Sequence, residues 1–169
     1  SNQTTITNGT TASSDNNLSG SGAVYVYRRS GTTWAQEAYI KAVNSDAGDS
    51  FGRSLSIDND TIAVGALFED SNQTTITNGT TASSNNDNTT SGAVYVYRRS
   101  GTTWAQEAYI KAANNDANDA FSNAVISLDG DTLVVGAPLE DSNQTTITNG
   151  TTSSSDNNLS NSGAVYVYR

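Results

Sequence analysis

The chain has 169 residues, a formal net charge of −9 and a hydrophobic fraction of 34%. The negative charge argues against nucleic acids and anionic membranes as partners, because both are bound through clustered lysine and arginine. The sequence contains no cysteine and no histidine. This excludes thiol nucleophiles, disulfides, histidine-based triads and zinc or haem sites. No apolar run approaches the ~20 residues that a membrane-spanning helix needs.

The chain opens with a stretch rich in serine, threonine and asparagine, residues 1–21, which returns in closely similar form at 71–91 and 142–162. Its Asn8-Gly9 pair favours a tight turn, so residues 4–11 could form a small hairpin. The alternative is a disordered linker. Because the stretch repeats nearly unaltered, we expect the later two copies to be ordered loops of similar shape, with Asn-Gly at their turns.

Residues 22–42 form the unit that organises the sequence. They return unchanged at 92–112, and their first seven residues return at 163–169. They predict two strands, Ala23 to Arg28 and Trp34 to Ile40, joined by a turn. The first strand is apolar on both faces and must therefore be covered on both sides. The second is expected to place Trp34, Gln36, Ala38 and Ile40 on one face.

Two further strands are predicted in each unit, first at 51–57 and then, after a tight turn at 58–60, at 61–66. The next copy of these strands is one residue longer, and the extra residue lies between Phe121 and Leu128. Side chains in a strand alternate with a period of two, so an inserted residue must be absorbed locally. We predict a β-bulge around residues 122–125.

Four short strands per unit, three of them apolar on both faces, are typical of a β-propeller blade covered by its neighbours. The chain contains Phe51-Gly52 with Gly65-Ala66 and then Phe121 with Gly136-Ala137-Pro138, each pair followed by a Gly-Ala-Val-Tyr-Val-Tyr strand. On these motifs the chain resembles the FG-GAP repeat family. The predicted fold class is all-β, with tandem four-stranded antiparallel blades, about two and a half as given. The expected units are residues 1–44, 45–115 and 116–169.

The FG-GAP family includes the blades of integrin α-chain propellers and of many secreted bacterial proteins, so the resemblance implies an extracellular, secreted or cell-surface location. Members that bind calcium carry a D-x-D-x-D-G-like loop between the first two strands of a blade. Here that loop is reduced to 58–60 and 129–131, which offers too few oxygen ligands and argues against calcium at the usual family position.

Other acidic residues bracket the long loops and could share a calcium ion if each loop folds back on itself; solvated loop charges are the alternative. These metal candidates are Glu69, Asp70, Asp87, Glu140, Asp141 and Asp156. No other cofactor is implied. The same loops carry N-glycosylation triplets, which arise freely in sequences rich in asparagine and threonine. The glycosylation candidates are Asn2, Asn8, Asn72, Asn78, Asn143 and Asn149.

The main functional hypothesis is a non-enzymatic, extracellular structural or adhesive repeat protein. Incomplete blades leave unpaired strand edges and uncovered apolar faces. We therefore expect an excerpt of a longer array, or a unit that joins its neighbours head to tail into a ring or a fibre. The alternative is a module that binds a glycan or an extracellular protein, with Trp34, Trp104 and the tyrosines as stacking platforms. The sequence pairs no catalytic acid with a base, which disfavours an enzyme.

Overall fold

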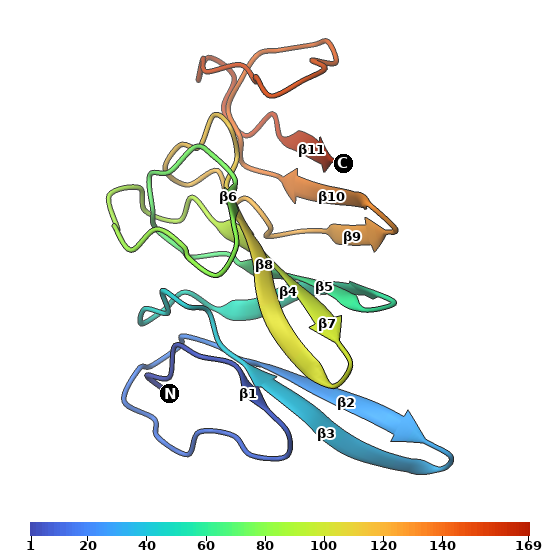
Figure 1. Cartoon of the computed structure of the whole chain (residues 1–169). Helices are drawn as coiled ribbons and strands as arrows, with labels where there is room; N and C mark the ends of the chain where they lie inside the picture. Colours follow the sequence, from blue (N-terminus) through green and yellow to red (C-terminus); the bar gives the residue numbers. More distant parts are fainter.

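The computed structural model describes all residues 1–169 and contains only β-strands, turns and loops. Its strands form three sheets that lie one above another in chain order (Figure 1). The strands are β1 (Thr7–Asn8), β2 (Val24–Ser30), β3 (Thr33–Ile40), β4 (Phe51–Asp58), β5 (Thr61–Ala66), β6 (Thr77–Asn78), β7 (Ala93–Ser100), β8 (Thr103–Ile110), β9 (Ile126–Asp129), β10 (Thr132–Ala137) and β11 (Ala164–Tyr168).

The three sheets differ in how many strands they contain. The first sheet has the order β1-β3-β2, the middle sheet β4-β5-β7-β8-β6, and the last sheet β11-β10-β9. All strand pairs within the sheets are antiparallel. The sheets do not close on themselves, so the predicted all-β architecture of incomplete four-stranded blades is confirmed, with a short extra strand at one edge.

The side chains of strand β8 in the middle sheet do not alternate regularly between its two faces along the whole strand. This corrects the alternation expected from the sequence. The register shifts after Val96, which pairs with Ala108, so that Tyr97 pairs with Gln106 and Glu107 has no partner. A bulge of this kind turns the following side chains to the opposite face. Trp104 therefore packs against the first sheet, whereas Ala108 packs against the last sheet.

The first strand of the last sheet, β9, is irregular at the position where the extra residue was predicted to be absorbed. The Ser122 amide donates to the Gly136 carbonyl oxygen at 3.0 Å, and the Gly136 amide donates to the Val125 carbonyl oxygen at 3.1 Å. The residues between them loop out, and β9 begins only at Ile126. The predicted position is confirmed, but the irregularity is larger than a simple bulge, and β4 already has one between Phe51 and Ser54.

The polar stretches do not form the local hairpin considered from the sequence. Thr77 and Asn78 instead pair with Tyr109 and Ala108 of β8, which makes β6 a fifth strand at the outer edge of the middle sheet. In the same way, β1 pairs with β3 in the first sheet. Each of these loops thus returns to cover the edge strand of its own sheet, where unpaired backbone groups would otherwise be exposed.

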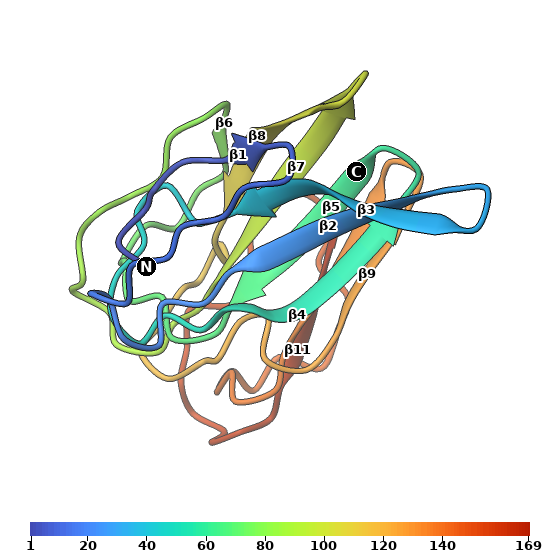
Figure 2. The same cartoon turned by 90° about the horizontal axis from the view of Figure 1, so that it is seen from below.

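The loops share their internal hydrogen bonds, which confirms their predicted similarity. The side-chain amide of Gln73 donates to the Thr75 carbonyl oxygen at 2.8 Å and to the Thr77 hydroxyl at 2.6 Å. Gln144 makes the same two bonds, at 2.6 and 2.5 Å, in loop 142–162. The glycines of the Asn-Gly pairs, Gly79 and Gly150, have φ values of +97° and +108°. Seen from below, the N-terminal loop and loop 71–91 lie at the same side of the stack (Figure 2).

No helix in this structure is long and apolar enough to cross a membrane.

Two glycines allow neighbouring sheets to approach closely. Each stands at the end of a polar loop, directly before the strand with the Ala-Val-Tyr-Val-Tyr sequence, Gly22 before β2 and Gly92 before β7. Gly92 has a φ of +80°, and a Cβ atom there would lie 2.0 Å from the carbonyl oxygen of Phe121 in the next repeat. Gly22 meets Phe51 in the same way, also at 2.0 Å. Only glycine allows two backbones to approach this closely.

We predict that Gly92→Ala lowers the free energy of unfolding by about 2–5 kcal/mol. The positive φ costs an alanine about 1–2 kcal/mol, and the backbone displacement forced by the new Cβ adds about 1–3 kcal/mol. Gly101→Ala is the matched control, since Gly101 has a φ of +63° but no atom within 4 Å of the added Cβ. Urea denaturation followed by tryptophan fluorescence measures both; equal losses for the two variants would contradict the prediction.

Candidate functional site: open end faces and buried lysine clusters

Each main sheet has an aromatic face and an aliphatic face. The aromatic face of the middle sheet meets the aliphatic face of the first sheet, and this interface is the larger of the two cores. Phe51 makes edge-on contacts with Tyr95 and Tyr97, with ring centroids 5.3 and 6.1 Å apart. The aliphatic residues that cover them from the first sheet are Val24, Val26, Ala38 and Ile40.

The interface between the middle and last sheets repeats this arrangement. Here the aliphatic face of the middle sheet, with Val94 and Ile110, meets the last sheet, whose buried side chains include Phe121. Phe121 stands edge-on to Tyr166, with a centroid distance of 5.4 Å, as Phe51 stands to Tyr95 in the repeat before. The two interfaces are thus built from the same residue types in the same order, aliphatic against aromatic.

The two ends of the stack expose the same two faces. Trp34 on the first sheet is 65% exposed, whereas its repeat equivalent Trp104 is 3% exposed. Val165 on the last sheet is 69% exposed, whereas its equivalent Val94 is fully buried. Tyr25 and Tyr27 of the first sheet and Val167 of the last sheet are also exposed, and so are Leu55 and Ile57 of β4 in the middle sheet. The open ends therefore present an aromatic face and an aliphatic face of the kind that already meet inside the molecule.

Polar contacts fix the position of one sheet on the next. Glu37 of the first sheet accepts a hydrogen bond from the indole Nε1 of Trp104 at 2.9 Å and forms an ion pair with Arg99 at 3.4 Å. The backbone amide of Trp104 donates to the side-chain oxygen Oδ1 of Asn8 at 2.8 Å. These bonds join residues of consecutive repeats, so they set the register of the stack.

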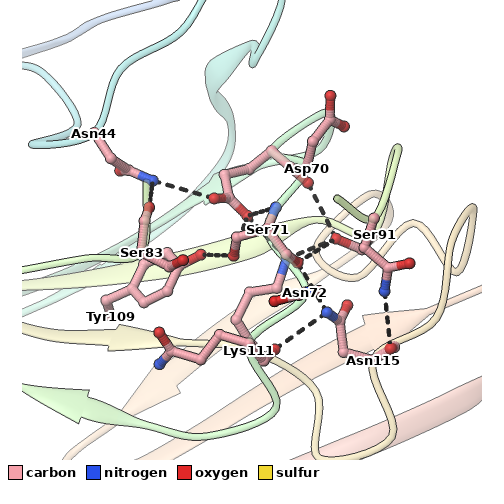
Figure 3. Close-up of polar contacts among 12 residues, drawn as sticks. Asn44, Asp70, Ser71, Asn72, Ser83, Ser91, Tyr109, Lys111 and Asn115 are labelled. Atoms are coloured by element: carbon pink, nitrogen blue, oxygen red, sulfur yellow. Dashed lines mark hydrogen bonds and ion pairs between the residues drawn. The ribbon is translucent and has the colours of Figure 1, made fainter. Parts of the chain in front are cut away.

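The middle sheet contains a buried cluster around Lys111, called here the lysine–glutamate cluster (Lys111, Glu69, Ser71 and Ser91). The Lys111 ammonium lies 2.8 Å from a Glu69 carboxylate oxygen and donates to the Ser91 hydroxyl at 2.7 Å. The Ser71 hydroxyl lies 2.6 Å from the Tyr109 hydroxyl (Figure 3). Burial lowers the pKa of Lys111, partly offset by the Glu69 charge.

The lysine–glutamate cluster connects segments that are distant in sequence. Glu69 follows β5, Lys111 follows β8, and Ser71 and Ser91 stand at the two ends of loop 71–91. From the previous repeat, the Asn44 side chain donates to Glu69 at 3.1 Å (Figure 3). The cluster therefore fastens both ends of the polar loop to the ends of the strands and to the neighbouring sheet.

The first and last sheets each contain only one of the two charged residues of this cluster. Lys41, the equivalent of Lys111, is buried and donates to the Ser21 hydroxyl at 2.6 Å and to the Gly22 carbonyl oxygen. Its ammonium has no carboxylate within ion-pair distance, and burial lowers its pKa. Glu140, the equivalent of Glu69, is buried and accepts hydrogen bonds from Asn114 at 2.8 Å and from Ser142, with no lysine beside it.

The structure does not gather the six metal candidates into ligand groups, since no three acidic side chains lie together as metal ligands. Glu69 is paired with Lys111, and Glu140 accepts hydrogen bonds from Asn114 and Ser142. Asp70 accepts a bond from the Thr90 amide at 2.6 Å, Asp141 from the Asn161 amide at 2.5 Å, and Asp87 from the Asn72 side chain at 3.3 Å. Asp156 accepts from the Ser154 hydroxyl. Calcium binding by these residues stays a prediction.

The glycosylation candidates all lie on the surface, where the bonds of two of them matter for modification. Asn2, Asn8, Asn72, Asn78, Asn143 and Asn149 are all exposed. The Asn8 side chain is bonded to the backbone of Trp104, and that of Asn72 donates to Asp87. A glycan on Asn8 would compete with its contact to the next repeat. Their glycosylation stays a prediction.

A family model described as FG-GAP repeat matches residues 34–97 and 104–154, more than half of the chain. The chain belongs to the FG-GAP repeat family. Each sheet is accordingly a blade: the first blade holds β1 to β3, the middle blade β4 to β8 and the last blade β9 to β11. No curated protein and no solved structure matches the chain.

Sequence reasoning missed the lysine–glutamate cluster. It treated Glu69 and Glu140 as loop-end acids and gave no role to Lys41 or Lys111. One signal was available: a lysine follows the apolar Ala-Tyr-Ile segment in both copies, where a solvated charge is unexpected. A buried lysine needs a partner, and the acidic pair before each polar loop is the nearest repeated candidate.

We predict that Lys111→Met lowers the free energy of unfolding by about 3–5 kcal/mol, because it leaves the Glu69 carboxylate buried without its counterion. Lys41→Met is the matched control: it changes the same residue type at the equivalent position, where no carboxylate is left unpaired. Adding Glu69→Gln to Lys111→Met is expected to recover part of the loss. Urea denaturation measures all three, and equal losses for Lys111→Met and Lys41→Met would contradict the role assigned to the ion pair.

Two buried aspartates in the connectors between blades give the fold a pH dependence. Asp49 accepts a hydrogen bond from the Asp46 amide at 2.7 Å, and Asp119 accepts one from the Asp116 amide at 3.1 Å. Burial raises the pKa of each carboxyl to about 6. An unfolded aspartate ionises near pH 4, so the folded chain binds more protons than the unfolded chain between about pH 4 and 6.

The stability contributed by these two carboxyl groups should therefore fall as the pH rises from 4 to 6. We predict that the double variant Asp49→Asn, Asp119→Asn flattens the pH dependence in this window and is more stable relative to wild type at pH 7.5 than at pH 4. The lowered pKa of Asp15, about 2, acts only below this window. The melting temperatures of wild type and the double variant, measured at a series of pH values, test this. Parallel curves of melting temperature against pH for the two proteins would refute the prediction.

Proposed function

We propose that the chain is a non-enzymatic structural or adhesive segment of an extracellular repeat protein, and that its blades associate head to tail. The observation that carries the proposal is the pair of blade interfaces, which are built from the same residue types in the same order, aliphatic against aromatic. One end presents the aromatic face and the other the aliphatic face, and each has the composition of a face that is buried inside the molecule. FG-GAP repeats are commonly extracellular propeller modules, which agrees with this role.

The geometry of the contact decides the form of the assembly. The two end faces differ, so association between copies is heterologous: it gives a ring if the rotation per copy closes, and a fibre if it does not. An uncovered patch of several large apolar side chains is a strong drive to associate. The buried charged groups support a structural role, because Glu69 and Lys111 are occupied by each other and by serine hydroxyls.

Binding of a glycan or an extracellular protein is the second candidate. It is favoured by the exposed side chains of Tyr25, Tyr27 and Trp34 on one face, because aromatic rings of this kind stack on sugars and anchor protein partners. Trp104 is no such platform, since it is buried between blades. A glycan array on the wild-type chain separates the two functions, because head-to-tail association requires no carbohydrate.

Light scattering after size-exclusion chromatography tests association. We predict oligomers of the wild-type chain at about 10–100 μM. Val167→Lys should weaken association at least about tenfold, because a charge on the aliphatic end face would be buried without a partner. Phe68→Lys is the control: Phe68 is exposed in the middle blade although both neighbouring blades are present. A folded wild-type monomer throughout this range would overturn the proposal.

A further inference from the structure

The lysine–glutamate cluster places an amine against a carboxyl group in a site that excludes water. The Lys111 side chain is fully buried, the Glu69 side chain is 2% exposed, and 2.8 Å separate Nζ from the nearer carboxylate oxygen, Oε2. Ser71 and Ser91, which line the same site, are also fully buried. All four residues belong to the middle blade, which is packed between a blade on each side.

The two oxygens of the Glu69 carboxylate have different surroundings. Oε2 faces Lys111 and also accepts hydrogen bonds from the backbone amide and the hydroxyl of Ser71, both at 3.3 Å. Oε1 accepts a hydrogen bond from the side-chain amide of Asn44 at 3.1 Å (Figure 3). Attack of an amine on a carboxyl group needs a nucleophile within reach and a donor for the oxygen on which negative charge develops. The site supplies both.

Burial makes the charged state of this pair unfavourable. Removing an ammonium and a carboxylate from water is costly, and their mutual attraction offsets this cost only in part. Burial also lowers the pKa of Lys111, which favours the neutral amine, the form that attacks a carbonyl carbon. Transfer of one proton from Nζ to Oε2 converts the ion pair into an amine and a carboxylic acid. An amide between the two would remove both charges from the interior.

From this geometry, we propose that Lys111 and Glu69 become joined by an isopeptide bond, an amide between Nζ and Cδ that forms spontaneously in the folded chain. The Nζ–Cδ bond forms and the Cδ–Oε2 bond breaks. Oε2 leaves as water with two protons, both of which come from the Lys111 ammonium. Oε1 becomes the amide oxygen and keeps its hydrogen bond from Asn44. The step is a condensation, so it needs no oxidant and no cofactor.

The two serines act on opposite sides of the reacting groups. The Ser91 hydroxyl lies 2.7 Å from Nζ and directs its own proton toward the carbonyl oxygens of Glu69 and Ser71, at 3.2 and 3.1 Å. Its lone pair therefore faces Nζ and holds the amine in place. The amide and hydroxyl of Ser71 donate to Oε2, the oxygen that leaves. Burial of the site then protects the finished amide from hydrolysis.

The bond would link positions 42 residues apart, at the ends of the strands between which loop 71–91 runs. The chain has no cysteine and can form no disulfide. An isopeptide bond gives a comparable covalent constraint on the unfolded chain, and reducing agents do not break it. This inference goes beyond the proposed function and does not depend on association between copies.

Mass spectrometry of the folded full chain gives a direct test. We expect an intact mass that is lower than the mass of the sequence by one water molecule. Trypsin does not cleave after an acylated lysine, so digestion should leave peptide 54–98, which contains Glu69, linked to peptide 100–169, which contains Lys111. The full sequence mass after prolonged incubation of the folded chain at neutral pH would overturn the proposal.

The tryptic peptides also separate the bond from other reactions. Ring closure at Asp129-Gly130 would release water too, but peptide 54–98 would then be free, and the proposal would be wrong. A link between Lys111 and Asn44 would release ammonia instead of water and would join peptide 42–53. That result would overturn the assignment of Glu69 as the group that is attacked.

Two variants test the roles of the groups in the site. Lys111→Arg is the matched control: it keeps a cation beside Glu69, but a guanidinium does not attack the carboxyl group, so the folded variant should have its full sequence mass. Asn44→Ala removes the donor to Oε1 and should slow the reaction at least about tenfold. Chains isolated in urea are refolded by dilution, circular dichroism confirms the β-sheet, and the intact mass is followed over time. An equal rate for folded Asn44→Ala and wild type, or loss of water from Lys111→Arg, would contradict these roles.

Discussion

The fold depends on the cover that neighbouring blades give to each other's faces, because each sheet is apolar on both sides. The third main strand of each blade, with the sequence Ala-Val-Tyr-Val-Tyr, directs valines to one side and tyrosines to the other, and neither side suits water. In the middle blade both sides are buried, with Tyr95 and Val94 fully so. A sheet of this kind cannot exist alone. Stacking follows from it, and so do the glycines that let consecutive backbones approach.

Stacking covers the faces of the sheets but leaves their outer edges exposed, and the polar loops cover these edges. A strand edge with free amide and carbonyl groups invites pairing with any other strand. Thr77 and Asn78 occupy that edge in the middle blade, and the lysine–glutamate cluster holds both ends of the loop in place. A stretch with the composition of a disordered linker is thereby ordered by backbone pairing and one buried ion pair. Its serines and threonines contribute hydrogen bonds instead of apolar contacts.

The fold class could be predicted from the sequence because strand pattern, turn signals and repeat period all agree. The bulge near residue 122 was also predictable in position, since a period of two tolerates no uncompensated insertion. The bulge at Glu107 was not, because it occurs in every copy of the strand and therefore leaves no mismatch to detect. It is this bulge that sends Trp104 and Ala108 to opposite faces. The partner of Lys111 could not be found either, since the contact joins residues 42 positions apart across a loop.

Covered edges and stacked faces together give the molecule a direction. The loop strands cover the outer edge of the first and middle blades, whereas the faces of the blades contact their neighbours along the stack. Blades in this chain are thus added along one axis only. The near-identity of the repeats also makes each new junction equivalent to those before it. An array of such units can change its length by whole repeats without any new interface having to evolve, because each added repeat contributes the same interface as the one before it.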